Sequence, residues 1–364
     1  MNSTVLIFPG GMPRAQDYLQ KCLREKRNVV GASSLGYDAA RDQYPLWTHL
    51  PYVTDPGFNE ALKEVVKNFG VSEIYTANLV VWNHLSGILG TLLPDVALAN
   101  TSPVDEVLSG YRSALSKAST ILNSPLPLAS SVLPSDMISE IETASLVRYS
   151  DMIPGMCDDD KFRALIEIAR CSVQGDIVEI GSWWGKSAFI LSSLSRSFEL
   201  GNVLCVDPWS NEHLIQNEEI VDSGSLQVDA EEALIVFQIG LQAFNCNHIN
   251  YQRMTSVEAS ECYGKGLSVY TEAFGETEYA GRISILHIDG NHAYEAVKAD
   301  VLAWSKFVSQ DGWVIIDDYI WPYGDGPQRI GDHFLEEHQS RIAASFVMGS
   351  ALFIQLHSSC RECF

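Results

Sequence analysis

The sequence predicts an α/β protein with two parallel-sheet domains, the second of which ends in an antiparallel hairpin. Three observations predict this class. Short apolar segments alternate with longer segments of helical periodicity along the chain. The 364 residues are enough for two domains with separate cores. An apolar fraction of 46% and a charged fraction of 19% are typical of a globular protein.

The first domain is expected at residues 1–122. Its strands and helices alternate as in a small Rossmann-like sheet with crossover helices. The expected strands are residues 5–8, 28–32, 49–53, 74–78 and 96–100, and the expected helices are residues 14–25, 58–68 and 103–122. Gly10 and Gly11 follow the first strand, but they lack the glycine spacing of a dinucleotide-binding loop, so they indicate a tight turn.

A linker is expected at residues 123–137, which are rich in proline and serine and favour neither helix nor strand. The second domain then spans residues 138–364. Two helices, at residues 138–147 and 161–171, are expected to cover an edge or a face of its sheet.

The stretch at residues 175–195, GDIVEIGSWWGKSAFILSSLS, predicts a buried strand, a glycine-bounded turn and the start of a helix. Such a turn can hold a phosphate or a nucleotide, because the helix N-terminus presents unpaired N–H groups. A P-loop, a NAD site and a site for S-adenosylmethionine (SAM) are the three interpretations. Gly185, Lys186 and Ser187 resemble the end of a P-loop, but that motif requires a glycine where the sequence has Ile180. The glycine pattern does not fit a NAD site either.

The remaining segments of this domain complete a sheet of five parallel strands and a hairpin. The expected strands are residues 177–180, 203–206, 249–252, 283–288 and 313–316, the hairpin is residues 345–349 and 351–356, and helices are expected at residues 230–244 and 295–308. Asp207 directly follows the second strand. An acidic residue there can accept hydrogen bonds from both ribose hydroxyls of an adenosine, which favours SAM. A cap of the next helix is the structural alternative.

Three carboxylates, those of Asp289, Asp317 and Asp318, follow neighbouring strands and are expected at one edge of the sheet. Like charges this close repel unless they are neutralised, and a hard divalent cation such as Mg²⁺ prefers carboxylate oxygens. The alternative is that one or two of them are helix caps or solvated acids. His292 lies three residues after Asp289 and titrates near neutrality, so it is the candidate general base. Five aromatic residues near strand ends are candidates for the pocket wall or for ordinary packing: Trp183, Trp184, Trp209, Tyr319 and Trp321.

The segments EIGSWWGKS, CVDPW, ILHIDGNHAYEAVKADVLAW and GWVIIDDY resemble the macrocin-type, metal-dependent sugar O-methyltransferases, over about residues 140–364. The resemblance implies a class I methyltransferase sheet, SAM and Mg²⁺ or another divalent cation, and methyl transfer to a hydroxyl of a sugar or polyol. It implies His292 as the base and Asp289, Asp317 and Asp318 as metal ligands. The residues assigned to the cofactor are Glu179, Gly181, Ser182, Trp183, Gly185, Ser187, Asp207, Trp209, Ser256 and Asp289.

Two features depart from this family. Asp317 stands where relatives often have Glu. The first domain instead resembles, at about residues 3–100, the small domain that precedes the catalytic part of ATP-grasp ligases. No ATP-grasp core follows, so ligase activity is not implied, and recognition of the substrate or self-association is the expected role.

Charge and cysteine content narrow the classes of partner. A formal net charge of −22 argues against nucleic acid as the main partner. The apolar run near the N-terminus is too short for a signal peptide or a membrane span, and eight scattered cysteines suit a reduced, cytoplasmic protein. Cys360 and Cys363 are interpreted as a feature of the tail. A homo-oligomer is expected from the family. The alternative functions are a non-catalytic sensor of SAM or a nucleotide and a P-loop-like ATP-using enzyme.

Overall fold

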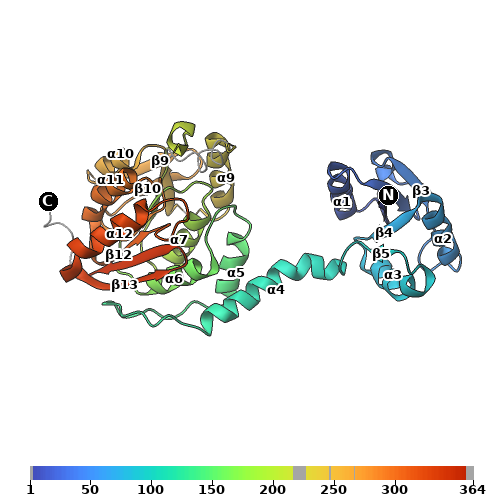
Figure 1. Ribbon diagram of the computed structural model, residues 1–364, viewed down its shortest axis with the longest axis horizontal. Coiled ribbons are helices and arrows are strands. Elements are labelled where there is room, and N and C mark those ends of the chain that lie inside the picture. The colour runs from blue at the N-terminus through green and yellow to red at the C-terminus, as the bar shows by residue number, and fades with distance from the viewer. Residues whose placement is uncertain (1–2, 216–226, 246, 266, 358–364) are drawn as a thin grey trace. The chain divides into compact units, whose positions relative to one another are not determined.

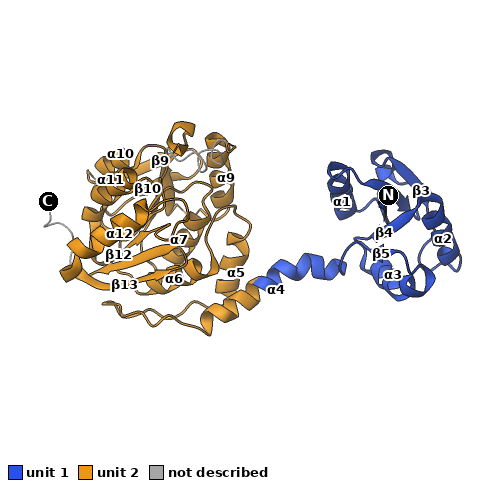
Figure 2. Cartoon of the chain, in the orientation of Figure 1, with its two compact units in different colours: residues 1–113 blue, residues 114–364 orange. Residues whose placement is uncertain are grey.

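The computed structural model of the chain describes residues 3–215, 227–245, 247–265 and 267–357 (Figure 1). The chain divides into two compact units, residues 1–113 and residues 114–364 (Figure 2). The boundary lies inside helix α4 (Pro103–Leu122), a helix that the sequence predicts in full. The sequence predicts the end of the first domain after this helix, at residue 122.

The first unit is built on a five-stranded parallel sheet in the order β3-β2-β1-β4-β5. Its strands are β1 (Thr4–Ile7), β2 (Asn28–Ser33), β3 (Leu46–His49), β4 (Val71–Tyr75) and β5 (Ala97–Leu98). Its helices are α1 (Pro13–Arg24), η1 (Ala39–Gln43), α2 (Phe58–Phe69) and α3 (Leu79–Leu92). Two apolar clusters fill the two faces, one under α1 and the other under α2 and α3. The alternating α/β order predicted for this part is confirmed.

Two elements of the first unit differ from the prediction. The third strand lies at residues 46–49, not at 49–53, because it is an edge strand with exposed or half-buried side chains and no apolar run marks it. Helix α3 was not predicted. Its N-cap is Asn78, whose side-chain oxygen accepts hydrogen bonds from the N–H groups of Val80 and Val81.

The expected linker contains no helix or strand, and it is attached to the second unit. The N–H of Ser131 donates to Oε1 of Gln355 at 3.0 Å, and the N–H of Ser135 donates to the carbonyl of Arg170 at 2.8 Å. Proline prevents this segment from forming a ladder of its own, so these two backbone groups are satisfied by a side chain of the strand that contains Gln355 and by the end of a helix.

The second unit contains a seven-stranded sheet in the order β13-β14-β12-β11-β6-β7-β8, in which β14 runs in the direction opposite to that of the other six strands. Its strands are β6 (Asp176–Ile180), β7 (Val203–Val206), β8 (Ile249–Gln252), β11 (Ile283–Ile288), β12 (Val308–Ile316), β13 (Ile342–Met348) and β14 (Ala351–Leu356). The predicted five parallel strands and terminal hairpin are confirmed.

Helices cover both faces of this sheet. One apolar cluster packs under α5 (Glu140–Ser150), α6 (Asp159–Arg170), α7 (Lys186–Ser197) and α9 (Ala230–Gln242). The other packs under α10 (Ser256–Tyr263), α11 (Tyr294–Trp304) and α12 (Gly326–Glu337). Short 3₁₀ turns are η2 (Asn211–Leu214), η3 (Ser305–Phe307) and η4 (Gln339–Arg341). Helix α12 and the hairpin of β9 (Ser268–Thr271) and β10 (Gly275–Glu278) were not predicted.

The order of connections reverses between β6 and β11. From β6 the chain continues through β7 to β8 on one side, and it returns to β11 and β12 on the other side. Strands β6 and β11 are buried along their whole length, which explains their isoleucine, leucine and valine residues and requires partners for the polar side chains among them. In an open α/β sheet, a crevice for ligands forms outside the carboxyl ends of strands at such a reversal.

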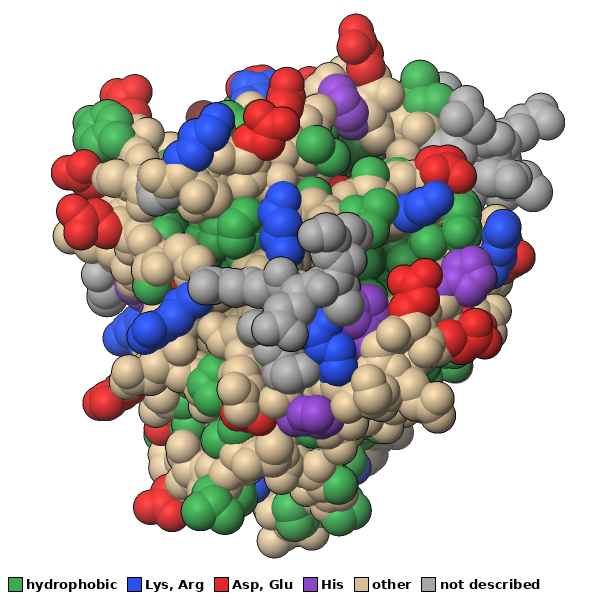
Figure 3. All heavy atoms as spheres, turned by 90° about the vertical axis from the view of Figure 1, so that its left-hand side faces the viewer, with side chains coloured by type: hydrophobic (Ala, Val, Ile, Leu, Met, Phe, Trp, Pro, Cys, Tyr) green, Lys and Arg blue, Asp and Glu red, His purple; other side chains and the backbone are tan. Residues whose placement is uncertain are grey.

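Acidic and basic side chains are interspersed over the face of the chain that Figure 3 shows, so its acidity is not gathered into one patch there. None of the helices in the described part of the chain is long and apolar enough to cross a membrane. Cys360 and Cys363 lie outside the described residues.

Candidate active site

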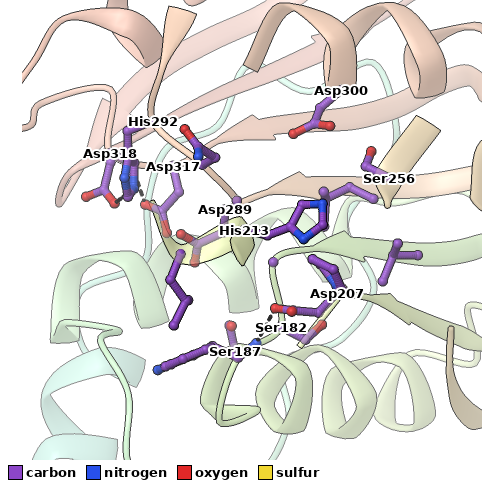
Figure 4. Close-up of a pocket in the computed structure, with 18 of the residues that line it drawn as sticks. Ser182, Ser187, Asp207, His213, Ser256, Asp289, His292, Asp300, Asp317 and Asp318 are labelled. Atoms are coloured by element: carbon purple, nitrogen blue, oxygen red, sulfur yellow. Dashed lines mark hydrogen bonds and ion pairs between the residues drawn. The ribbon is translucent and has the colours of Figure 1, made fainter. Parts of the chain in front are cut away.

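A cavity of about 1060 Å³ opens at the carboxyl edge of the second sheet. It is lined by the segments that follow β6, β7, β8, β11 and β12, together with parts of α6 and α11. The close-up in Figure 4 shows two groups of side chains. We call the glycine turn after β6 together with Asp207 the donor end, and we call Asp289, His292, Asp317 and Asp318 the acidic end.

The donor end begins with a turn that requires glycine at two positions. Gly181 has a φ of +84°, and a Cβ there would lie 2.1 Å from the carbonyl oxygen of Asp289. Gly185 has a φ of +90°, and a Cβ there would lie 2.8 Å from the ring of Phe237. Only glycine adopts this backbone without strain in so little space. The turn therefore lies directly against the end of β11 and starts helix α7 at Lys186.

Asp207 is fixed by the backbone of neighbouring segments. Its Oδ2 accepts a hydrogen bond from the N–H of Trp183 at 3.0 Å, and its Oδ1 accepts one from the N–H of Trp209 at 2.7 Å. Burial raises the pKa of this carboxyl to about 6, although both N–H groups lower it. The residue is 7% exposed and lines the cavity, so the carboxylate presents a fixed acceptor to a ligand at the donor end.

The acidic end combines the ends of two adjacent strands. Asp289 follows β11, and Asp317 and Asp318 follow β12, which pairs with β11 in parallel. Nε2 of His292 lies 2.7 Å from Oδ2 of Asp318. One ligand atom each of Asp289, His292 and Asp318 lies within 4.8 Å of the others. The strand ends therefore bring together the four residues that the sequence singled out for catalysis and metal binding.

Lys161 is a member of this cluster that the sequence analysis missed. It comes from the first turn of α6, its side chain is 2% exposed, and it lines the same cavity. Its Nζ pairs with Oδ2 of Asp317 and lies 3.3 Å from Oδ2 of Asp289. Burial opposes the charged form, but Asp289 and other nearby acidic groups outweigh it and hold the pKa of Lys161 above its ordinary value. Burial also raises the pKa of Asp289, and Lys161 opposes that increase.

Helical periodicity offered a signal for this lysine. Lys161, Leu165 and Ile168 lie at intervals of four and three residues, which places them on one face of the helix. Leu165 and Ile168 are fully buried. The flanking Asp159 and Asp160 made Lys161 resemble an ordinary surface charge at a helix start.

Glu179, which the sequence assigns to the cofactor, lies behind the cavity in the structure, so its assignment stays a prediction. It is fully buried, lies opposite His287 on β11 in the sheet register, and does not line the cavity. Nδ1 of His287 and Oε1 of Glu179 are 3.0 Å apart. Burial raises the pKa of Glu179, but hydrogen bonding to His287 and the charge of His287 bring it below its ordinary value. The two side chains form a buried pair between the donor end and the acidic end.

Trp209, also assigned to the cofactor from the sequence, lies behind the cavity wall as well. It is 1% exposed, it packs against Phe237 and Tyr251, and it is not among the described residues that line the cavity. Its Nε1–H donates to the carbonyl of Trp183 at 2.9 Å. Trp209 therefore supports the turn from behind, whereas Trp183 and Trp184 line the cavity themselves.

The other two aromatic candidates lie near β12. The ring of Trp321 stacks on His292 at a centroid distance of 4.2 Å. The hydroxyl of Tyr319 donates to Oδ1 of Asp332 at 2.6 Å, so Tyr319 is engaged away from the acidic end.

The remaining assigned cofactor residues line the cavity: Gly181, Ser182, Trp183, Gly185, Ser187, Asp207, Ser256 and Asp289. Ser256 starts α10, where its hydroxyl accepts a hydrogen bond from the indole N–H of Trp304 at 2.9 Å.

Asp300 and His213 also line the cavity, and the sequence did not indicate them. Burial raises the pKa of Asp300 to about 6. Asp300 lies on the side of Ser256, away from His292 and Asp318, in Figure 4.

Comparison with protein families gives the deciding observation for this part of the chain. Residues 178–319 match the family model described as a methyltransferase domain. This part of the chain is similar to methyltransferase domains. The match agrees with the SAM-dependent methyltransferase domain that the sequence predicts for the second unit. A search of curated proteins finds no match.

Several solved structures are similar to the chain at low identity. The MycE methyltransferase of mycinamycin biosynthesis, in complex with Mg, SAH and mycinamycin VI, is 14% identical over 52% of this chain, with a TM-score of 0.31. The match covers 47% of the MycE chain, so this chain spans less than half of it. The O-methyltransferase NovP is 15% identical over 69% of this chain and 99% of its own, with a TM-score of 0.37. CalS11, the calicheamicin methyltransferase, is 14% identical over 71% of this chain and 94% of its own, with a TM-score of 0.39.

Proposed function

We propose that the chain transfers the methyl group of SAM to a hydroxyl of a sugar or another polyol-bearing small molecule. The observation that carries the proposal is the position of His292 beside Asp318 in the cavity whose other end is the glycine turn with Asp207. A methyl donor at one end and a base at the other end would place the acceptor hydroxyl between them. Holding the two reactants in such a geometry is worth roughly 7–11 kcal/mol in favourable cases.

At the donor end, Asp207 would accept hydrogen bonds from the ribose hydroxyls of SAM. Each of its oxygens already accepts one backbone hydrogen bond, and a carboxylate oxygen can accept a second. The N-terminus of α7 and the glycine turn would lie along the rest of the cofactor, where no Cβ separates ligand and backbone.

At the acidic end, His292 would take the proton of the acceptor hydroxyl. The oxygen forms a bond to the methyl carbon as the bond from this carbon to the sulfonium sulfur breaks, which leaves a neutral thioether and a protonated His292. Asp318, 2.7 Å from Nε2, would orient the imidazole and stabilise its charged form. The stacked ring of Trp321 would restrict the imidazole further.

A divalent cation, for which Mg²⁺ is the first candidate, fits the carboxylates of Asp289 and Asp318 next to His292. Their ligand atoms lie close together and line the open cavity, and carboxylate oxygens are the ligands that Mg²⁺ prefers. When bound, such a cation would lower the pKa of a hydroxyl that it contacts. Asp317 fits this role less well than we expected from the sequence. Its Oδ2 pairs with Lys161, and its Oδ1 accepts hydrogen bonds from the N–H of Asp318 and the hydroxyl of Ser350.

For the first unit we propose a role in recognising the acceptor or in self-association. Its separate sheet and its separate apolar clusters support an independent domain. A homo-oligomer and a cytoplasmic location belong to the same proposal, the second because scattered cysteines suit a reducing compartment.

The proposal is tested by incubating the protein with SAM and a panel of hydroxylated acceptors and by searching for the methylated product by mass spectrometry. CalS11 is described as a TDP-rhamnose 3'-O-methyltransferase, so nucleotide-linked deoxysugars are tested first, followed by glycosides and catechol-like diols. Methylation that is lost in Asp318→Asn and retained in Asp300→Asn supports the proposed acidic end, because both carboxyls line the cavity and only Asp318 contacts His292.

Two results would contradict parts of this proposal. Tight SAM binding with no methyl transfer to any acceptor would instead indicate a sensor. Turnover that is unchanged by EDTA would remove the divalent cation from the mechanism and leave His292 with Asp318 as the reacting pair.

A further inference from the structure

The inner part of the acidic end has the composition of a cation site. Nε2 of His287 lies 3.6 Å from Oδ2 of Asp317 and 3.8 Å from Oδ2 of Asp289. These three side chains form a group whose ligand atoms all lie within 4.8 Å of one another. We call this group the inner position, and we call the carboxylates of Asp289 and Asp318 beside His292 the outer position.

His287 makes the inner position more than a cluster of acids. Its side chain is fully buried, and its Nδ1 forms a hydrogen bond with Oε1 of Glu179. Its Nε2 is buried without a hydrogen-bond partner among the described residues, and it faces the two carboxylates. The two carboxylates that face this imidazole are held close together in the interior, and buried carboxylates this close require a compensating positive charge.

The charge that the structure places there is the ammonium of Lys161. Its Nζ contacts Oδ2 of both Asp289 and Asp317, the same two oxygens that face His287. Lys161 is almost fully buried, and an ammonium in such a place requires paired carboxylates. Lys161 and the inner position therefore depend on each other.

We propose that the ammonium of Lys161 occupies the inner position as a built-in cation, so that Asp317 is committed to this lysine and a divalent cation is confined to the outer position. The inference deepens the proposed function and rests on it for the divalent cation. It assigns Lys161 as a positioning residue that holds Asp289 and Asp317 together across two strand ends before any ligand binds.

The charges of the acidic end predict whether replacing Lys161 strengthens or weakens the binding of a divalent cation. Asp289, Asp317 and Asp318 carry three negative charges, and Lys161 with a divalent cation supplies three positive charges. Replacing Lys161 by an apolar residue leaves one negative charge in excess and frees an oxygen of Asp317. Both changes are expected to strengthen the binding of a divalent cation, because the carboxylates then lack the ammonium and a nearby cation stabilises their charged form.

The test is a titration with Mn²⁺ alone, in which free Mn²⁺ is followed by its electron paramagnetic resonance signal. Lys161→Met, which keeps an unbranched side chain, is expected to bind Mn²⁺ about tenfold more tightly than the natural protein, or more. Lys161→Arg keeps the charge and is expected to remain near the natural affinity. The matched control is Lys186→Met, which removes a positive charge from the wall of the same cavity. Among the described residues, Lys161 forms ion pairs with Asp289 and Asp317, and Lys186 forms none with them.

A double variant keeps the inference testable if Lys161→Met does not fold. Lys161→Met with Asp317→Asn removes one charge of each sign, so it relieves the unpaired buried carboxylate. Because Asp317 is not a ligand in this proposal, the double variant is expected to bind Mn²⁺ within about threefold of the natural protein. A much weaker affinity would show that Asp317 is a metal ligand and would overturn the inference.

The outcomes separate this inference from the proposed function. If the natural protein binds Mn²⁺ and Lys161→Met binds it no more tightly, the inference is wrong and the metal site stands. If the natural protein binds no Mn²⁺ and Lys161→Met does, the inference holds and the divalent cation is removed from the proposed function. If no variant binds Mn²⁺, both statements about the cation are wrong, while methyl transfer is still decided by its own assay.

Discussion

The two ends of the cavity are built in different ways. The donor end is formed by a continuous stretch from β6 to α7, joined by Asp207, and its key contacts are made by the backbone. The acidic end collects side chains from α6, β11 and β12, and the partners of Lys161 lie 128 and 156 residues away in sequence. The comparison teaches that the donor end depends on local conformation, whereas the acidic end depends on charge compensation between distant elements.

The largest expected effect tests whether proton transfer at the acidic end is separate from cofactor binding at the donor end. His292→Ala is expected to lower kcat by about 10²- to 10⁴-fold, because general base catalysis contributes this much. The affinity for SAH, measured by calorimetry, should stay within a factor of about three, because His292 belongs to the acidic end. An equal loss in SAH affinity would mean that the two ends are not separate.

The next effect tests the place where the two ends touch. Gly181→Ala is expected to destabilise the fold by a few kcal/mol, because it adds strain at positive φ and a clash with the backbone of Asp289. Gly281→Ala is the matched control. Gly281 also has a positive φ, +71°, but a Cβ there would meet nothing within 4 Å. Its cost should be about 1 kcal/mol in thermal or urea unfolding. Similar losses for both variants would argue against the close approach of the turn to β11.

A smaller effect tests the donor end alone. Asp207→Asn is expected to weaken SAH binding by roughly 10- to 100-fold, because hydrogen bonds to a charged group contribute about 1.5–3 kcal/mol. The value of kcat at saturating SAM should change little. Unchanged SAH affinity in calorimetry would remove Asp207 from the ribose and leave it as a support of the turn.

The smallest expected effect is a pH dependence of the donor end. Burial raises the pKa of Asp207 to about 6, so the carboxylate form that accepts the ribose hydroxyls is present above this pH and is lost as the pH falls through it. Between pH 7.5 and pH 5, SAH affinity is expected to fall by about tenfold. Asp207→Asn should abolish this dependence.

Asp300 provides the control for the pH experiment, because its pKa is also raised to about 6 and it lines the same cavity. If Asp300→Asn removes the pH dependence and Asp207→Asn does not, the titrating group has been assigned wrongly.

The sequence by itself determined the elements that local rules control. Apolar runs marked the buried strands, and glycines marked the turn after β6. The acids at strand ends marked Asp207, Asp289, Asp317 and Asp318, and all of these line the cavity. These signals can be read in a sequence because strand ends of a parallel sheet lie at one edge and because helix and strand periods repeat within a few residues.

The tertiary structure alone decided which charges meet. Glu179 and His287 each stand in an apolar strand, and only the register of β6 and β11 shows that they face each other. Lys161 resembled a surface lysine until the fold placed it between Asp289 and Asp317. The physical reason is that ion pairing acts over a few ångströms in space, and no local pattern encodes which distant residue will be that near.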